Sequence, residues 1–491
     1  MTMAQSFGCF VQEINRFTKR VFILSAVLLT VRLIFISNTF LVDDEAYYAM
    51  YARHLSWGYI DHGPVVAFVI WFFTQLFESS FTVRLGSVVM MTSLAYLLYF
   101  FGKKYFNQVT ALTISLLVAA NLLFHTNSII ITPDVPLAFF SITSILFYYI
   151  AYFKNEKYIY LGGAMLGLAV LSKVSALFPA IGIVLFPVII KDKRYWLKNI
   201  HYYGSFLLAL IFFIPFVVWN FQNDMAFVRY QGAHIVQRGG FNHFIELWLG
   251  VALLIGPLYF YYSVFKPIAN LKDWKQISDE KKYFTLVTAV PLCYFMIHSL
   301  FSRFELNWVA PVFFGGLFLL GLELDSIKKL KKGFRIQIIY SLVLISLIMA
   351  QSFYPILPLK GKSDPTNRYY MYSNLIDDTK KMLNEQPDLA KLRIVSNEFQ
   401  IPSMINFYLN PTMEAICLSI DYHETLYSFL YDQNSIKGED FIYIHDKDVF
   451  PEKLKPYFDN YELILKSEES RNNSSVATYT LWLVKNYAGK I

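Results

Sequence analysis

Residues 41–64 read LVDDEAYYAMYARHLSWGYIDHGP and place three successive carboxylates, Asp43, Asp44 and Glu45, directly after an apolar span. Two histidines, an arginine and several aromatic side chains follow before apolar sequence resumes. Acidic side chains at a membrane edge are costly unless they meet water, a cation or a substrate. We therefore expect the other loops on the same side of a membrane to assemble around this stretch.

The composition of the whole chain is typical of a polytopic membrane protein. Of the 491 residues, 56% are hydrophobic and only 16% are charged, whereas soluble proteins carry about a quarter charged residues. The three cysteines are scattered and give neither a disulfide framework nor metal-site spacing. The net charge of +7 comes mostly from short basic loops, which is a topology signal and predicts no nucleic-acid partner.

Apolar segments predict about eleven transmembrane helices, since a spanning helix needs roughly 20 apolar residues. If residues 64–78 lie along the outer interface instead of spanning it, most Lys and Arg fall on the inner side, as the positive-inside rule favours. The N-terminus is then inside and the C-terminal tail outside. The predicted spans are 21–37, 82–101, 108–125, 136–153, 158–172, 175–190, 203–219, 246–265, 284–301, 308–324 and 335–353.

This arrangement also places the unusual polar motifs on the outer face, where they become candidates for one substrate pocket. Lys173 ends an apolar helix, and Arg229, His234 and Arg238 share one outer loop. Fixed cations on this face predict binding of a phosphate group, with snorkelling to lipid headgroups as the alternative. The other pocket candidates are Asp43, Tyr47, Tyr48, Asp61, His62, Asp134, Glu305 and Asn307.

The acidic triplet has a functional and a structural interpretation. A carboxylate at a wet membrane edge can act as a general base on an acceptor hydroxyl, and an adjacent carboxylate raises its pKa. Asp43, Asp44 and Glu45 are also the candidates if a divalent cation is bound. Structurally, the triplet would cap a helix that starts near Ala46.

The remaining candidates carry structural alternatives too. Asp134 lies between two prolines at the mouth of a helix, where it either caps that helix or lines the site. His62 can touch phosphate, ligate a metal or make a structural hydrogen bond. Tyr47, Tyr48, Trp57 and Tyr59 could stack on a sugar or a prenyl chain, although aromatic belts at membrane interfaces are the commoner use of such residues.

The composition changes near residue 360, and residues 360–491 are predicted to form a small α/β domain on the outer side, after a transmembrane catalytic domain over 1–359. Helices are expected near 402–409 and 423–431. The predicted strands are 393–397, 415–419, 441–445, 462–465 and 479–484.

Five motifs between residues 40 and 311 resemble, in order, those of family-39-like glycosyltransferases of the protein-mannosyltransferase type. The departures from their pattern are Gly63 in place of Pro, Val174-Ser175 after Lys173, and Val309 in place of Pro. The matching motifs are DEAYY at 44–48 with GYIDHGP at 58–64, TPDVPL at 132–137, GLAVLSK at 167–173, Trp219-Asn220 with Tyr230-Gln231, and ELNWVAP at 305–311.

The resemblance implies a GT-C fold and an inverting transferase of the bacterial inner membrane that uses a polyprenyl-phosphate sugar. Such relatives act on lipid A or on protein hydroxyls, so the expected acceptor is lipid A or another envelope glycolipid, with a protein as the alternative. By analogy, Asp44 aligns with the catalytic aspartate of the first outer loop, Glu45 with its partner, and Lys173 with a lysine near the donor phosphate. The rival interpretations are a lipid-linked sugar transporter, which would bind near the bilayer midplane, and an oligosaccharide ligase.

Overall fold

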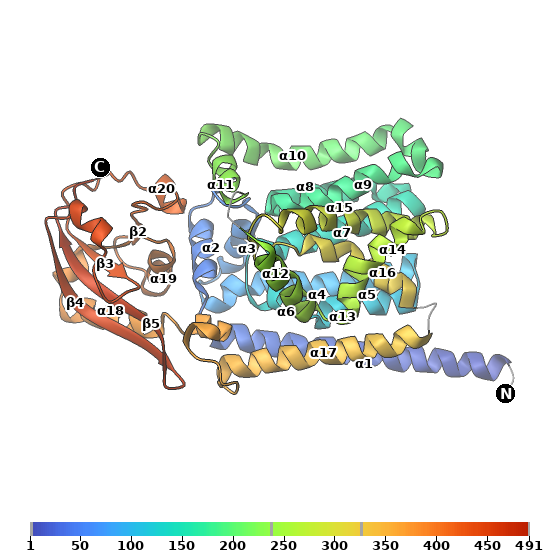
Figure 1. Cartoon of the computed structure of the whole chain (residues 1–491), viewed down its shortest axis with the longest axis horizontal. Coiled ribbons are helices and arrows are strands. Elements are labelled where there is room, and N and C mark those ends of the chain that lie inside the picture. The colour runs from blue at the N-terminus through green and yellow to red at the C-terminus, as the bar shows by residue number, and fades with distance from the viewer. Residues whose placement is uncertain (1–2, 236–238, 325–327, 490–491) are drawn as a thin grey trace. The chain divides into compact units, whose positions relative to one another are not determined.

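The computed structural model describes residues 3–235, 239–324 and 328–489 (Figure 1). The chain folds as two compact units, and each contains segments that are distant in the sequence. The helical unit consists of residues 1–36, 62–66 and 84–346. The sheet unit consists of residues 37–61, 67–83 and 347–491. The acidic triplet therefore belongs to the same unit as the C-terminal tail.

Helices build almost all of the helical unit, and α8 and α10 run side by side in it (Figure 1). Short 3-10 turns, η1 (Glu156–Tyr158), η2 (Val174–Ala176) and η3 (Lys191–Lys198), connect several of them. The helices are α1 (Met3–Asn38), α4 (Ser80–Tyr105), α5 (Gln108–Ala120), α6 (Leu122–Ile129), α7 (Asp134–Phe153), α8 (Ile159–Ser172), α9 (Leu177–Ile189), α10 (Ile200–Gln222), α11 (Ala226–Ile235), α12 (Phe241–Ile255), α13 (Pro257–Phe260), α14 (Lys266–Lys272), α15 (Asp279–His298), α16 (Pro311–Leu324) and α17 (Lys328–Phe353).

Each predicted span falls on helical structure, but the count of eleven is not confirmed. Among the described residues, five helices are long and apolar enough to cross a membrane, or up to seven if two bent pairs are counted as single spans. The segment 64–78 forms α3 (Val65–Thr74). At ten residues this helix is about 15 Å long, too short to cross the roughly 30 Å hydrocarbon core. Its length agrees with the prediction that 64–78 does not span.

The predicted span 108–125 is broken at Asn121, where α5 and α6 meet at an angle of 54°. The Asn121 side chain accepts a hydrogen bond from the Leu123 amide and donates one to the Ile255 carbonyl at 2.7 Å. The buried Arg32 donates to the Ala119 carbonyl at 2.6 Å. A break in a buried helix is tolerated because these side chains satisfy the freed backbone groups.

The predicted inner loops meet at one end of the helical unit. Lys154, after α7, lies 2.9 Å from Glu280 at the start of α15. Lys281 lies 2.6 Å from Glu323 in the last turn of α16, and Lys266 lies 3.5 Å from the same carboxylate. The predicted inner loops at 154–157 and 266–282 and the end of α16 therefore lie at one end of the bundle.

The sheet unit contains a five-stranded mixed sheet in the order β2-β1-β3-β5-β4. The pairs β1–β2 and β1–β3 are parallel, and β5 pairs antiparallel with β3 and β4. Each strand overlaps one of the predicted strands, and α19 and α20 overlap the two helices predicted in the tail. The bounds are β1 (Arg393–Ser396), β2 (Ile416–Cys417), β3 (Phe441–His445), β4 (Asn460–Arg471), β5 (Ser474–Lys485), α18 (Ser373–Glu385), α19 (Gln400–Leu409), α20 (Leu426–Leu430), η5 (Gly361–Ser363), η6 (Pro365–Tyr369), η7 (Leu389–Lys391) and η8 (Glu452–Tyr457).

Helix α2 (Asp43–Arg53) packs against α19 within the sheet unit (Figure 1). The Tyr47 ring lies 4.2 Å from the Phe399 ring, and its hydroxyl accepts a hydrogen bond from the Leu426 amide at 2.8 Å. At the other end of α2, His54 lies 2.9 Å from Glu414. These contacts fix the acidic first turn of α2 relative to the sheet.

Candidate functional site

Asp43 and Asp44 share one cation, Arg368, which lies in η6 of the sheet unit. The Arg368 guanidinium donates to Asp43 Oδ1 and, at 2.8 Å, to Asp44 Oδ2. The Asp44 side chain stays 42% exposed, whereas that of Asp43 is 15% exposed. We call these three residues the acid cluster. It holds two carboxylates and one guanidinium, so it is one positive charge short of neutrality.

The surroundings of Asp44 in the acid cluster raise its pKa. Burial of the carboxyl and the neighbouring Asp43 raise the pKa of Asp44 above its usual value, and Arg368 opposes that shift. Burial works against the charge of Arg368, but Asp43 and Asp44 raise the pKa of the guanidinium. A carboxylate with a raised pKa and an exposed edge has the properties of a general base.

The structural interpretation of the acidic triplet is also realised, because its residues form the first turn of α2. The helix starts at Asp43 and not near Ala46, because the triplet itself is helical. Glu45 is fully buried, and its Oε2 accepts a hydrogen bond from the Val42 amide at 3.0 Å. This contact caps the helix, and acids in the first turn favour its dipole.

In the helical unit the structure brings together three predicted residues, Asp134, Lys173 and Asn307. Lys173 Nζ lies 2.8 Å from Asp134 Oδ1, with side chains that are 14% and 5% exposed. The Asn307 amide donates to Asp134 Oδ2 at 2.7 Å. Asp134 is the first residue of α7, and its two carboxylate oxygens accept from Lys173 and Asn307. Lys173 is bound inside the unit and does not snorkel. We call Asp134 and Lys173 the buried pair.

The Gly63 departure from the family pattern has a steric cause. A Cβ at Gly63 would lie 1.7 Å from the Leu171 carbonyl oxygen, which is two residues before Lys173. Only glycine fits at this approach. Its neighbour His62 therefore stands beside the end of α8 that carries Lys173.

The other predicted residues are placed as follows. Arg229 is exposed and donates to the Asp224 carbonyl. The nearest oxygen of Glu305 lies 3.9 Å from Arg303, in a pair that is exposed on both sides. Asp61 accepts a hydrogen bond from the Tyr51 hydroxyl, and Tyr48 is buried. His234 belongs to α11, but its side chain and the whole of Arg238 lie outside the described residues.

Within the described ranges, no group of three or more His, Cys, Asp or Glu side chains is arranged to hold a metal ion. In the acid cluster the cation that faces the two aspartates is Arg368.

Arg368 was not predicted from the sequence. It lies 324 residues after Asp44, in a segment of changed composition that matches no family motif. The sequence indicates only the local turn that carries Arg368. Asp364 caps η6 by accepting a hydrogen bond from the Thr366 amide, and Pro365 is the first residue of η6. Asp-Pro predicts a short helical start, but not which distant side chain the turn will face.

Comparison with known proteins agrees with the motifs. Residues 61–219 match the family model described as dolichyl-phosphate-mannose-protein mannosyltransferase. The lipid A galacturonosyltransferase RgtD of Rhizobium johnstonii is 23% identical over 305 residues, which is 59% of this chain and 61% of that protein. The match thus spans less than two thirds of the length of this relative.

The fold is that of ArnT from Cupriavidus metallidurans. Its crystal structures in the apo state and bound to undecaprenyl phosphate each align with a TM-score of 0.62 at 15% identity, covering 94% of this chain and 98% of ArnT. The family match, the sequence relative and the shared fold together confirm the predicted resemblance to GT-C glycosyltransferases.

Proposed function

We propose that this protein is a multi-pass enzyme of a bacterial inner membrane that transfers one monosaccharide from a polyprenyl-phosphate donor to an outer-face acceptor, lipid A or another envelope glycolipid. The acid cluster carries this proposal, because the raised pKa of Asp44 and its exposed edge suit a base in the family's first-loop motif. The ArnT complex with undecaprenyl phosphate and the lipid A transferase relative support the donor and acceptor classes.

The reaction we infer is a displacement at the anomeric carbon. An acceptor hydroxyl forms the new glycosidic bond, its proton goes to Asp44, and the bond from the anomeric carbon to the phosphate oxygen breaks with inversion. The leaving polyprenyl phosphate gains negative charge, which a fixed cation stabilises. Lys173 is assigned this role, with Arg229 and His234 as further donors to the phosphate. Arg368 positions Asp44 and limits the rise of its pKa.

The experiment is sugar transfer by membranes that carry the Asp44→Asn variant. Loss of a general base lowers rates by about 10²–10⁴-fold. Asp388→Asn is the matched control, because this acid lies in the same unit, is 95% exposed and pairs with the exposed Lys391. Full transfer by correctly inserted Asp44→Asn protein would remove Asp44 from the mechanism.

A further inference from the structure

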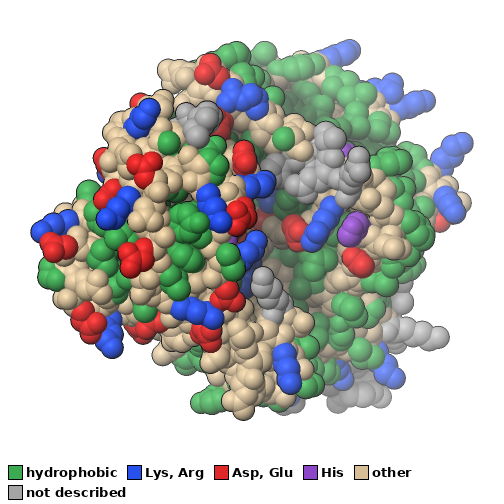
Figure 2. Space-filling view, turned by 60° about the vertical axis from the view of Figure 1, so that its left-hand side comes forward, with side chains coloured by type: hydrophobic (Ala, Val, Ile, Leu, Met, Phe, Trp, Pro, Cys, Tyr) green, Lys and Arg blue, Asp and Glu red, His purple; other side chains and the backbone are tan. Residues whose placement is uncertain are grey.

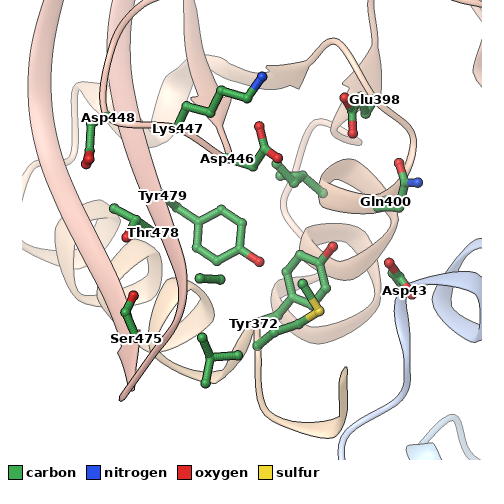
Figure 3. Close-up of a pocket in the computed structure, with 14 residues that line it drawn as sticks. Asp43, Tyr372, Glu398, Gln400, Asp446, Lys447, Asp448, Ser475, Thr478 and Tyr479 are labelled. Atoms are coloured by element: carbon green, nitrogen blue, oxygen red, sulfur yellow. The ribbon is translucent and has the colours of Figure 1, made fainter. Parts of the chain in front are cut away.

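A cavity of about 530 Å³ lies within the sheet unit and reaches Asp43 of the acid cluster (Figure 3). An adjoining cavity of about 290 Å³ shares Glu398, Ile401, Asp446 and Lys447 with it. Both are lined only by residues of the sheet unit. The two cavities form one pocket, which we call the edge pocket.

The topology of the sheet explains the position of the edge pocket. After β1 the chain leaves through α19 towards β2, and after β3 it leaves through η8 towards β4, on the opposite side of the β1–β3 pair. Parallel strands whose exits diverge leave a crevice beyond their carboxyl ends, the usual ligand position in α/β sheets. Glu398 follows β1 and Asp446 follows β3, and both line this crevice.

The charges of the edge pocket favour hydroxyl groups or an amine and disfavour phosphate. Acidic and basic side chains are interspersed over the surface of the sheet unit (Figure 2), but the pocket is lined by more carboxylates than lysines: Asp43, Glu398, Asp421, Asp446 and Asp448 against Lys447 and Lys453. Arg368 and Lys466 face Asp43 and Asp448 from outside this lining. Burial and the nearby Asp446 raise the pKa of Glu398, although Lys447 opposes this shift. Carboxylates accept hydrogen bonds from hydroxyls and ammonium groups.

The walls add aromatic and polar features that suit a sugar ring. The Tyr372 and Tyr479 rings stack at 5.5 Å and both line the larger cavity (Figure 3). Tyr443 lines the smaller cavity, its side chain is fully buried, and its hydroxyl has no hydrogen-bond partner among the described residues. A buried hydroxyl without a partner costs free energy, so a ligand that bonds it is favoured.

We propose that the edge pocket is the acceptor subsite and that it takes an uncharged or amino-sugar headgroup through its hydroxyls. This inference rests on the proposed function, because Asp43 joins the pocket to the base: Asp43 Oδ1 accepts from the Asp44 amide at 3.1 Å, and both acids share Arg368. A saccharide in the pocket presents a hydroxyl next to the acid cluster. The acceptor group is then a sugar hydroxyl and not a phosphate.

The test is saturation-transfer NMR on the full-length protein in detergent, with glucosamine, glucose and glucose 6-phosphate as probes. Glucosamine and glucose should bind, and glucose 6-phosphate at least about tenfold more weakly, since the excess of carboxylates over lysines in the pocket lining repels its phosphate. The Glu398→Gln/Asp446→Asn variant should weaken glucosamine binding about tenfold and remove the discrimination against phosphate. Tyr443→Phe should weaken binding by a smaller factor, and the exposed Asp388→Asn should leave it unchanged.

Two results would overturn the assignment. The first is glucosamine binding that the pocket variants leave unchanged. The second is binding of glucose 6-phosphate as tight as that of glucose, or displacement of the bound sugar by Ca²⁺. The Asp44→Asn variant separates this proposal from the proposed function, because it should lose transfer and keep glucosamine binding. If the protein binds glucosamine but Asp44→Asn does not affect transfer, the acceptor subsite is supported and the role of Asp44 as base is rejected.

Discussion

The acid cluster and the buried pair differ in charge balance and in exposure. The buried pair joins one carboxylate to one ammonium, both nearly out of solvent, and Asn307 occupies the second carboxylate oxygen. In the acid cluster two carboxylates share one guanidinium, and nearly half of the Asp44 side chain is exposed. A matched pair is already neutral, whereas an unbalanced cluster at a surface can exchange a proton. This difference suits the buried pair to keep Lys173 in a fixed position and the acid cluster to accept a proton.

The largest effect is expected from Lys173→Met, which leaves Asp134 buried without its cation. Breaking a buried pair costs about 3–5 kcal/mol of stability, so both thermal stability in detergent and sugar transfer should fall sharply. The double variant Lys173→Met/Asp134→Asn should recover stability, because no buried charge is left unpaired, but not transfer. Recovery of transfer in the double variant would show that Lys173 has only a structural role.

Arg368→Gln should change the pH dependence of transfer more than its rate at high pH. Arg368 lowers the pKa of Asp44, so its removal raises that pKa and the base is protonated at a higher pH. The acidic limb of kcat/KM should move towards alkaline pH by about one unit. Arg303→Gln, which removes an exposed arginine of the helical unit, is the control. An unmoved limb would mean that Asp44 is not the titrating base.

Asp43→Asn should move the same limb in the opposite direction and by less. Asp43 raises the pKa of Asp44, so Asp44 then stays ionised at lower pH, and the limb should shift to acid pH by about half a unit. The asparagine Oδ1 can still accept from the Asp44 amide. Shifts of the same sign in Asp43→Asn and Arg368→Gln would contradict the charge balance assigned to the acid cluster.

The smallest effect is expected at the exposed pair Arg303–Glu305, whose charges are 3.9 Å apart and both about 60% exposed. Exposed ion pairs contribute about 0–1 kcal/mol, so Glu305→Gln should leave thermal stability within that range. A rise in KM at unchanged stability would show that Glu305 contacts substrate, as its motif predicts. An unchanged KM would remove it from the pocket.

The sheet could be predicted closely because its core strands are short apolar runs. The predicted strand 441–445 coincides with β3, and 393–397 exceeds β1 by a single residue. Strands β4 and β5 run further than predicted, since their polar ends pair up to a two-residue turn, Asn472-Asn473, with φ values of 52° and 54°. Asparagine pairs with positive φ form type I′ hairpin turns, so the signal was present in the sequence.

Contacts between distant segments account for what could not be predicted. A single apolar run at 108–125 hides the break at Asn121, because its cause is a hydrogen bond to Ile255. The predicted span 246–265 is likewise interrupted at Gly256, whose φ is 85°. The outer-face motifs located Asp44 and Lys173 as candidates, but the partner of Asp44 comes from the tail, where no periodicity or motif points to Arg368.

Sidedness tests the central claim most directly, because Asp44 and Lys173 can serve one transfer reaction only from the same side of the membrane. In a background with Cys9, Cys293 and Cys417 replaced by Ser, the Asp44→Cys, Arg303→Cys and Lys104→Cys variants are treated in intact cells with a membrane-impermeant thiol reagent. Position 303 reports on the buried pair, because it lies four residues before Asn307, which binds Asp134. We expect labelling of Asp44→Cys and Arg303→Cys in intact cells. Lys104→Cys should be labelled only after permeabilisation. Labelling of Asp44→Cys and Arg303→Cys from opposite sides, or of both only from the cytosol, would contradict the account.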